Sequence, residues 1–198
     1  LQQSPTQLWQ SRGLFTEYQC WTIYRITIGE LNLFHSGWPM HRDCPEPTCS
    51  CQAETIDHIV WTCEKAQLAW QRWVSKWLGR ACPLSEMTKL QAALATRTAP
   101  GTTHDFLAHA QHCIPAWTPH HDEAMTTIWR VWATVTPVLL WRLRNDAVFN
   151  NERTSPSDTS AAVWSAGIYQ LQAIGAAWKK SNKTRIKAWC LETCLSIL

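Results

Sequence analysis

Residues 44–63 concentrate the side chains that could do chemistry, because they hold four cysteines and one histidine in the sequence CPEPTCSCQAETIDHIVWTC. Thiolates and imidazoles are the usual ligands of Zn²⁺, and a structural zinc site takes four of them in a tetrahedron. Two cysteines would supply one half of such a site, and a later histidine and cysteine the other half. The candidate ligands are Cys44, Cys49, His58 and Cys63, and Cys51 could replace Cys49. The segment therefore predicts one Cys3His zinc site.

All four ligands would come from the protein, which leaves no open coordination position. A closed zinc site of this kind stabilises a fold and performs no catalysis. The alternative is two disulfides or buried free thiols, with His58 incidental. The chain has nine cysteines in 198 residues, and an odd count in a chain of this length fits a pure disulfide scaffold poorly.

The spacing of His58 and Cys63 constrains the local backbone. Five residues of an ideal helix turn through about 500°, which leaves the two side chains about 140° apart. The two ligands converge only if the turn between them is distorted or the helix begins late. Thr55 is placed to cap a turn that begins at Ile56, and Asp57 would lie in its first turn, where the helix dipole favours an anion.

The segments around this block are predicted to be helical, because apolar residues recur every three or four positions and the alternation typical of strands is almost absent. The predicted helices are 9–34 with a break near Gly29, a stripe from Ile59 to Leu78 that stops at Gly79, and 81–98 with Ser85 as N-cap. Two more follow: 123–150, kinked or split at Pro137, and a last helix from Thr159, capped by Ser157, to near the C-terminus. Residues 35–47 and 99–123 are predicted to be connections, the second with one short helix.

The predicted fold class is therefore all-α, a helical bundle braced by one Cys3His zinc loop. Segments 1–80, 81–122 and 123–198 are expected to be an N-terminal part with the zinc loop, a polar helical connector and a C-terminal part of long helices, within one integrated domain. The chain contains 14 tryptophans. Most of them should lie in the core, because indole rings are large and usually at least half buried.

Four motifs accompany the cysteine block in a recognisable order. GELNLF (29–34) precedes it, ETIDH (54–58) is followed by a cysteine five residues after its histidine, and AQLAWQRW (66–73) and WRLRNDAVF (141–149) come later. This order resembles the zinc-binding domain at the C-terminal end of non-LTR retrotransposon reverse transcriptases. In that family a CxxC pair precedes an E-T-x-x-H-x4-C block, and the second cysteine stands nine residues before the histidine. The resemblance favours Cys49 over Cys51, although four residues separate Cys44 from Cys49 here.

The resemblance implies a non-catalytic module that binds RNA or DNA. The polymerase domain of such elements holds its catalytic metal ions with paired aspartates, and this chain has no Asp-Asp pair. A nuclease of the restriction type would need an Asp followed by E-x-K or D-x-K, and the chain has no convincing arrangement of this kind. We therefore expect no enzymatic activity from this chain, although a parent polypeptide could carry reverse transcriptase activity.

The segment WKKSNKTRIKAW (178–189) combines cations with two tryptophans. Cations neutralise phosphates, and indoles stack on unpaired bases. The predicted nucleic-acid-binding residues are Lys179, Lys180, Lys183, Arg185 and Lys187, together with Arg142 and Arg144. The alternative is a solvated basic face near a helix end. The net charge of +3 permits contact with nucleic acid without requiring it.

Other functions stay open at this point. A domesticated retrotransposon-derived module that binds another protein, such as a secreted effector of a pathogen, is the alternative function, with exposed tryptophans as its interface. A second metal site in the histidine-rich segment would use His104, His109, His112 and Cys113, with His120 and His121 beyond, but these do not share one helical face. No run of 18 apolar residues is present, so no membrane span is expected.

The beginning of the chain bears on its origin. It starts at Leu1 without an initiator methionine or a signal-like apolar stretch, so we expect a processed product or part of a longer polypeptide. An intracellular location, nuclear or cytoplasmic, is favoured, and secretion stays open.

Overall fold

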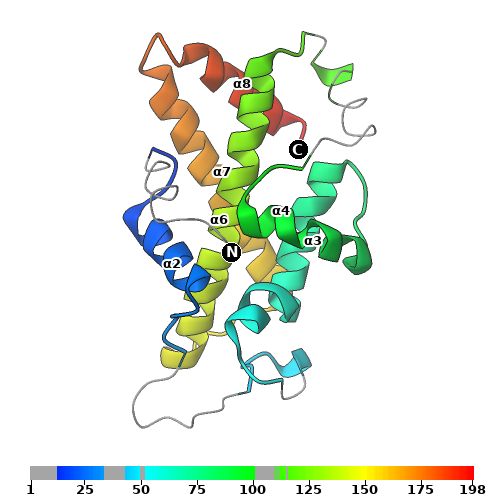
Figure 1. Cartoon of the computed structure of the whole chain (residues 1–198), viewed down its shortest axis with the longest axis vertical. Coiled ribbons are helices and arrows are strands. Elements are labelled where there is room, and N and C mark those ends of the chain that lie inside the picture. Colours follow the sequence, from blue (N-terminus) through cyan, green and yellow to red (C-terminus); the bar gives the residue numbers. More distant parts are fainter. Residues whose placement is uncertain (1–12, 34–42, 50–51, 101–109, 111, 115) are drawn as a thin grey trace. The chain divides into compact units, whose positions relative to one another are not determined.

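The computed structural model describes residues 13–33, 43–49, 52–100, 110, 112–114 and 116–198, and its elements there are helical (Figure 1). They are α2 (Glu17–Thr27), the 3₁₀ turn η1 (Pro47–Cys49), the π-helical turn η2 (His58–Thr62), α3 (Glu64–Leu78), α4 (Leu84–Thr96), α6 (Pro119–Phe149), α7 (Pro156–Lys179) and α8 (Arg185–Ser196). No strand occurs in these described ranges, where Asp43 and Ala53 form an isolated bridge. The all-α prediction is confirmed.

The chain divides into two compact units. Unit 1 comprises Leu1–Trp70 and Thr134–Trp164, and unit 2 comprises Gln71–Ala133 and Ser165–Leu198. The borders fall inside α3, α6 and α7, so each of these helices contributes one stretch to each unit. The three segments expected from the sequence, 1–80, 81–122 and 123–198, stay a prediction.

The core of unit 1 is mainly aliphatic. Its buried members are Ile23, Ile26, Leu31, Ile59, Val60, Val138 and Trp141. Helix α2 supplies the first two of them, and it is shorter than the predicted 9–34, of which 9–12 and 34 lie outside the described residues. It begins after Thr16, which forms a capping box with Gln19, and it ends just before Gly29, whose φ is 74°. The predicted break near Gly29 is confirmed.

The core of unit 2 is built from tryptophans. The rings of Trp73 and Trp132 stack with their centroids 4.3 Å apart and an interplanar angle of 12°. The rings of Trp77 and Trp129 meet edge to face at 4.7 Å. A Cβ atom on Gly167 would lie 2.5 Å from Nε1 of Trp132, so only glycine permits this close approach. The predicted core role is confirmed for these four tryptophans, whereas Trp21 and Trp189 are more than half exposed.

Helix α6 runs without interruption from Pro119 to Phe149, and Pro137 does not split it. Proline removes one backbone N–H and crowds the preceding turn, which usually breaks a helix. Here the flanking residues Thr134, Val135, Thr136 and Val138 are all buried, and this packing holds the helix together. None of the described helices, α6 included, is both long and apolar enough to cross a membrane.

Several predicted helix ends are corrected. Helix α4 begins at Leu84 after Pro83, rather than behind a Ser85 cap. Helix α7 begins at Pro156, because the hydroxyl of Ser155, not Ser157, accepts the backbone N–H of Asp158 at 3.0 Å.

The last predicted helix is in fact two, α7 and α8, separated by a turn. In that turn the hydroxyl of Thr184 donates to the carbonyl of Trp178 at 2.6 Å. The predicted stop of α3 is confirmed, since Gly79 follows Leu78 with a φ of 69°, which favours glycine.

Candidate metal centre

The four predicted ligands come together in unit 1. The ligand atoms of Cys44, Cys49, His58 and Cys63 all lie within 4.8 Å of one another. The Cys63 sulfur is 3.9 Å from that of Cys44 and 3.8 Å from that of Cys49. Two thiolates bound to one tetrahedral Zn²⁺ at about 2.3 Å would lie about 3.8 Å apart, whereas a disulfide needs about 2.05 Å. These cysteines are not disulfide-bonded, and the group could hold a metal ion.

One ring nitrogen of His58 is left for a metal. The side chain is only 3 % exposed. Its Nδ1 lies 3.0 Å from the hydroxyl oxygen of Thr62, while its Nε2 is buried without a hydrogen-bond partner. A buried polar atom without a partner is costly. A metal ion among the three sulfur atoms would satisfy it.

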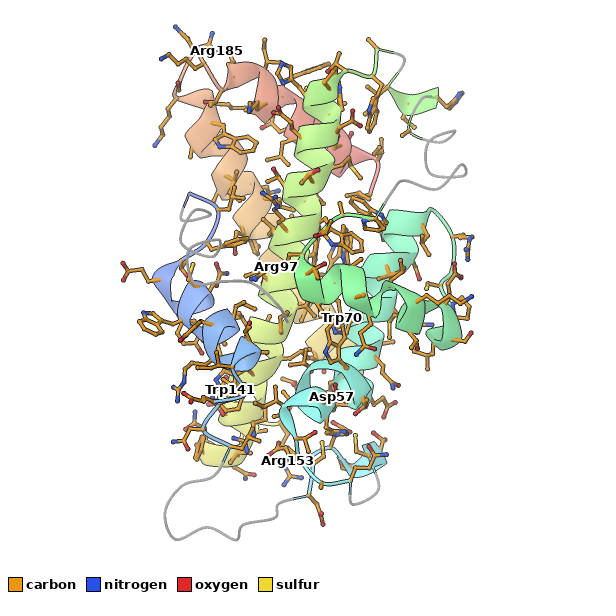
Figure 2. All side chains as sticks on the ribbon, viewed as in Figure 1. Asp57, Trp70, Arg97, Trp141, Arg153 and Arg185 are labelled. Atoms are coloured by element: carbon orange, nitrogen blue, oxygen red, sulfur yellow. The ribbon has the colours of Figure 1, made fainter. Side chains whose placement is uncertain are left out.

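The predicted distortion between His58 and Cys63 is the π-helical turn η2. The hydroxyl of Thr55 accepts the backbone N–H of His58 at 3.0 Å, and the helical turn begins at Ile56, as expected. Asp57 precedes η2 (Figure 2). The backbone N–H of Cys63 then donates to the carbonyl of His58 at 2.8 Å. This i→i+5 bond widens the turn, so residues five apart lie nearly above one another.

Backbone N–H groups surround the sulfur atoms. The N–H of Glu46 lies 3.5 Å from the Cys44 sulfur, and those of Glu64 and Lys65 hydrogen-bond the sulfurs of Cys49 and Cys63. The last two residues open α3, and a helix N-terminus favours negative charge. Thiolates are therefore supported by peptide dipoles from two sides.

The three thiols differ in acidity. The hydrogen bond with the Cys44 thiol, aided by the N–H of Lys65, lowers the pKa of Cys63 from 9.0 to about 6 against the effect of burial. The same hydrogen bond and then burial raise the pKa of Cys44, and burial raises that of Cys49. Metal binding must therefore displace protons from Cys44 and Cys49, which makes it weaker at low pH.

A buried ion pair anchors the cysteine loop to α6. Arg144 donates from Nε to a Glu54 carboxylate oxygen at 2.9 Å and from Nη2 to the other oxygen, and Nη2 also donates to the Leu33 carbonyl at 2.9 Å. Arg144 is 7 % and Glu54 3 % exposed. Arg144 was predicted to bind nucleic acid, but its burial and its pairing assign it to this anchor. Sequence reasoning missed Glu54, although it is the first residue of the quoted ETIDH motif.

A second ion pair lies beside the site, and the packed residues around it leave a small cavity. Lys65 Nζ lies 3.1 Å from a carboxylate oxygen of Glu46, and both side chains are largely buried. The cavity beside the ligands, which Glu54, Arg144 and Leu140 also line, has a volume of about 30 Å³. A cavity of that size has room for about one or two water molecules. The arrangement suits a structural metal ion.

The other predicted cations lie on the surface. Lys180, Lys183 and Arg185 are exposed at the end of α7 and the start of α8, where Figure 2 labels Arg185. Lys179 pairs with Glu192 at 2.6 Å and Lys187 with Glu123 at 2.8 Å. Arg142 belongs to unit 1, is 69 % exposed and lies 3.9 Å from Asp146.

Several candidates cannot be placed or are not gathered into a site. Cys51, His104 and His109 lie outside the described residues. His112 and Cys113 are exposed, whereas His121 is buried and stacks on Trp117 at 5.1 Å. Across the described parts of the chain, the Cys3His group is the only set of candidate metal ligands that comes together.

No protein-family model, curated protein or solved structure matches this chain.

Proposed function

We propose that the Cys3His group binds one Zn²⁺ and that this ion is structural. The observation that carries the proposal is the meeting of three sulfur atoms and a ring nitrogen of His58 within 4.8 Å, where Nε2 of that ring is buried without a hydrogen-bond partner. Zn²⁺ prefers thiolate and imidazole in a tetrahedron, whereas Mg²⁺ and Ca²⁺ prefer oxygen ligands. With four protein ligands the ion has no open position for a substrate or a reactive water.

The test is metal stoichiometry by elemental analysis of the purified full chain. We expect about one zinc per chain in the wild type, loss of zinc in Cys49→Ser, and retention in Cys51→Ser. Retention in Cys49→Ser with loss in Cys51→Ser would move the second ligand to Cys51. A wild-type chain that takes up no zinc would end the proposal.

We further propose that the chain is a non-catalytic module that binds RNA or DNA, as the resemblance to the retrotransposon zinc-binding domain suggests. The exposed cations Lys180, Lys183 and Arg185 support it, because none of them pairs with an acidic side chain among the residues that the structure describes. Trp189 is 55 % exposed on α8 and offers an indole face for stacking. Little sequence readout is expected from phosphate neutralisation and stacking.

The test is binding of a fluorescent single-stranded RNA and DNA at several salt concentrations. We expect affinity to fall with salt, and the triple variant Lys180→Gln, Lys183→Gln, Arg185→Gln to weaken binding and flatten the salt slope by about one per lost phosphate contact. The matched control is Lys76→Gln, Lys89→Gln, Arg130→Gln, which removes three other exposed cations of unit 2. Equal losses in both triples, or no binding at low salt, would contradict the proposal.

A stripe of exposed side chains on α2 and its C-cap residue supports the alternative, a protein-interaction module. Tyr18 and Trp21 are each 53 % exposed and Ile28 43 %, and they recur on one face of the helix together with exposed Arg25. Aromatic residues are enriched in interfaces. If nucleic-acid binding fails while Trp21→Ala abolishes binding to a purified partner protein, this alternative replaces the first.

A further inference from the structure

Thr62 lies within hydrogen-bond distance of one of the two ring nitrogens of His58. Its hydroxyl oxygen lies 3.0 Å from Nδ1, and Nε2 has no hydrogen-bond partner. A neutral imidazole carries its proton on one nitrogen and a lone pair on the other. A metal ligand must present the lone pair, so Nε2 would face the metal and Nδ1 would carry the proton. Thr62 would then accept that proton's hydrogen bond.

The π-helical turn explains how one histidine reaches both partners. In η2 the carbonyl of His58 accepts the N–H of Cys63, five residues on, so the two ligand side chains lie on one side of the turn. Thr62, at the preceding position, then lies beside Cys63 and within reach of the opposite edge of the imidazole. Thr62 is also β-branched, which restricts the rotamers of its hydroxyl.

We propose that Thr62 is the positioning residue of the metal centre. Its hydroxyl accepts a hydrogen bond from Nδ1–H of His58, fixes the tautomer with the lone pair on Nε2, and orients the ring toward the three sulfur atoms. The inference rests on the proposed metal function. Partners of this kind typically change metal affinity by about 10- to 100-fold when they are removed.

The exposure of Thr62 makes it a clean site to test. Its side chain is on the surface, so replacement by valine removes the acceptor without opening a cavity. Because this hydrogen bond is only partly buried, water can partly replace the lost acceptor, so we expect an effect near the lower bound, about 10-fold. Thr62→Ser keeps the hydroxyl and should bind metal within about threefold of the wild type.

The first experiment titrates the full chain with Co²⁺ and follows its visible absorption bands, with Zn²⁺ competition for the dissociation constant. Thr62→Val should bind Co²⁺ about 10-fold more weakly and Thr62→Ser should restore the affinity. The matched control is Thr126→Val, whose hydroxyl donates to the Asp122 carbonyl in unit 2 at 2.9 Å, and it should leave the affinity unchanged. Equal affinity in wild type and Thr62→Val would overturn the inference.

The second experiment needs no variant, and so it holds even if Thr62→Val does not fold. Long-range ¹H–¹⁵N correlations of the zinc-loaded wild type report which nitrogen of His58 is protonated and which binds the metal. Protonated Nδ1 with metal-bound Nε2 is expected, and metal on Nδ1 would overturn the inference. If the wild type binds neither Zn²⁺ nor Co²⁺, the proposed function itself fails, which is a distinct result.

Discussion

The two units are stabilised in different ways. Unit 1 contains residues 43–49 and 52–55, in which the turn η1 and an isolated bridge are the regular features, and the candidate metal ligands and buried ion pairs gather polar groups there. Unit 2 contains four buried tryptophans in mutual ring contact and, among its described residues, no group of metal ligands. A loop that cannot bury enough apolar surface needs cross-links, whereas helices that carry large aromatic side chains do not.

Loss of the metal should have the largest effect, and it should act on unit 1 alone. Structural zinc contributes about 10–16 kcal/mol of apparent binding free energy in small zinc domains, so Cys63→Ser or chelation should strongly destabilise unit 1. Hydrogen exchange with mass spectrometry should show lost protection in residues 43–63 and α2, with protection kept around Trp73 and Trp132. Cys113→Ser, at an exposed cysteine, is the control. Uniform protection after complete zinc removal would refute the contrast.

Removal of one ring from the aromatic core should affect unit 2 instead. Trp73 contacts Trp77, Trp129 and Trp132 and is 1 % exposed, so Trp73→Ala should cost about 3–5 kcal/mol of the free energy of unfolding. Zinc stoichiometry should stay at the wild-type value. Urea unfolding measures the first quantity and elemental analysis the second. The control is Trp189→Ala, at a tryptophan that is 55 % exposed. Zinc loss in Trp73→Ala would show that the units are not separately stabilised.

The buried ion pair of Glu54 and Arg144 should also contribute to the stability of unit 1. Glu54→Gln leaves the buried guanidinium without its counter-charge, and we expect a loss of about 3 kcal/mol in urea unfolding of the zinc-loaded protein. The double variant Glu54→Leu, Arg144→Met removes both charges and should recover much of that loss. A double variant that is as unstable as Glu54→Gln would mean that the hydrogen bond from Arg144 to the Leu33 carbonyl, not the charge pair, is the stabilising contact.

The smallest effect is expected at the surface of unit 2. The hydrogen bond from Lys187 holds the pKa of Glu123 below its usual value of 4.5. Because the folded pKa is the lower one, the pair stabilises the fold above the unfolded-state pKa, and this is lost as the pH falls through the folded value. A ¹³C titration of the Glu123 carboxyl should give a pKa below 4.5 that returns toward it in Lys187→Met. An unchanged pKa in that variant would assign the shift to His120.

Local features of the sequence determined much of the site. The distorted turn before Cys63, the cap at Thr55 and the end of α3 at Gly79 depend on neighbours within a few residues, and the candidate ligands lie within residues 44–63, where the resemblance favours Cys49 over Cys51. Such features follow from spacing, backbone preference and ligand chemistry. The all-helical class also follows from local periodicity.

Only the tertiary structure decided the remaining features. The sequence predicts Arg144 to be an exposed cation, but the structure buries it. Its partner Glu54 is 90 residues away in the chain and forms an ion pair with it in the fold. Pro137 does not split α6, because the residues around it are buried on every side of the helix. These outcomes depend on the free energy of contacts between distant residues, which can exceed local propensity and which no stretch of sequence displays.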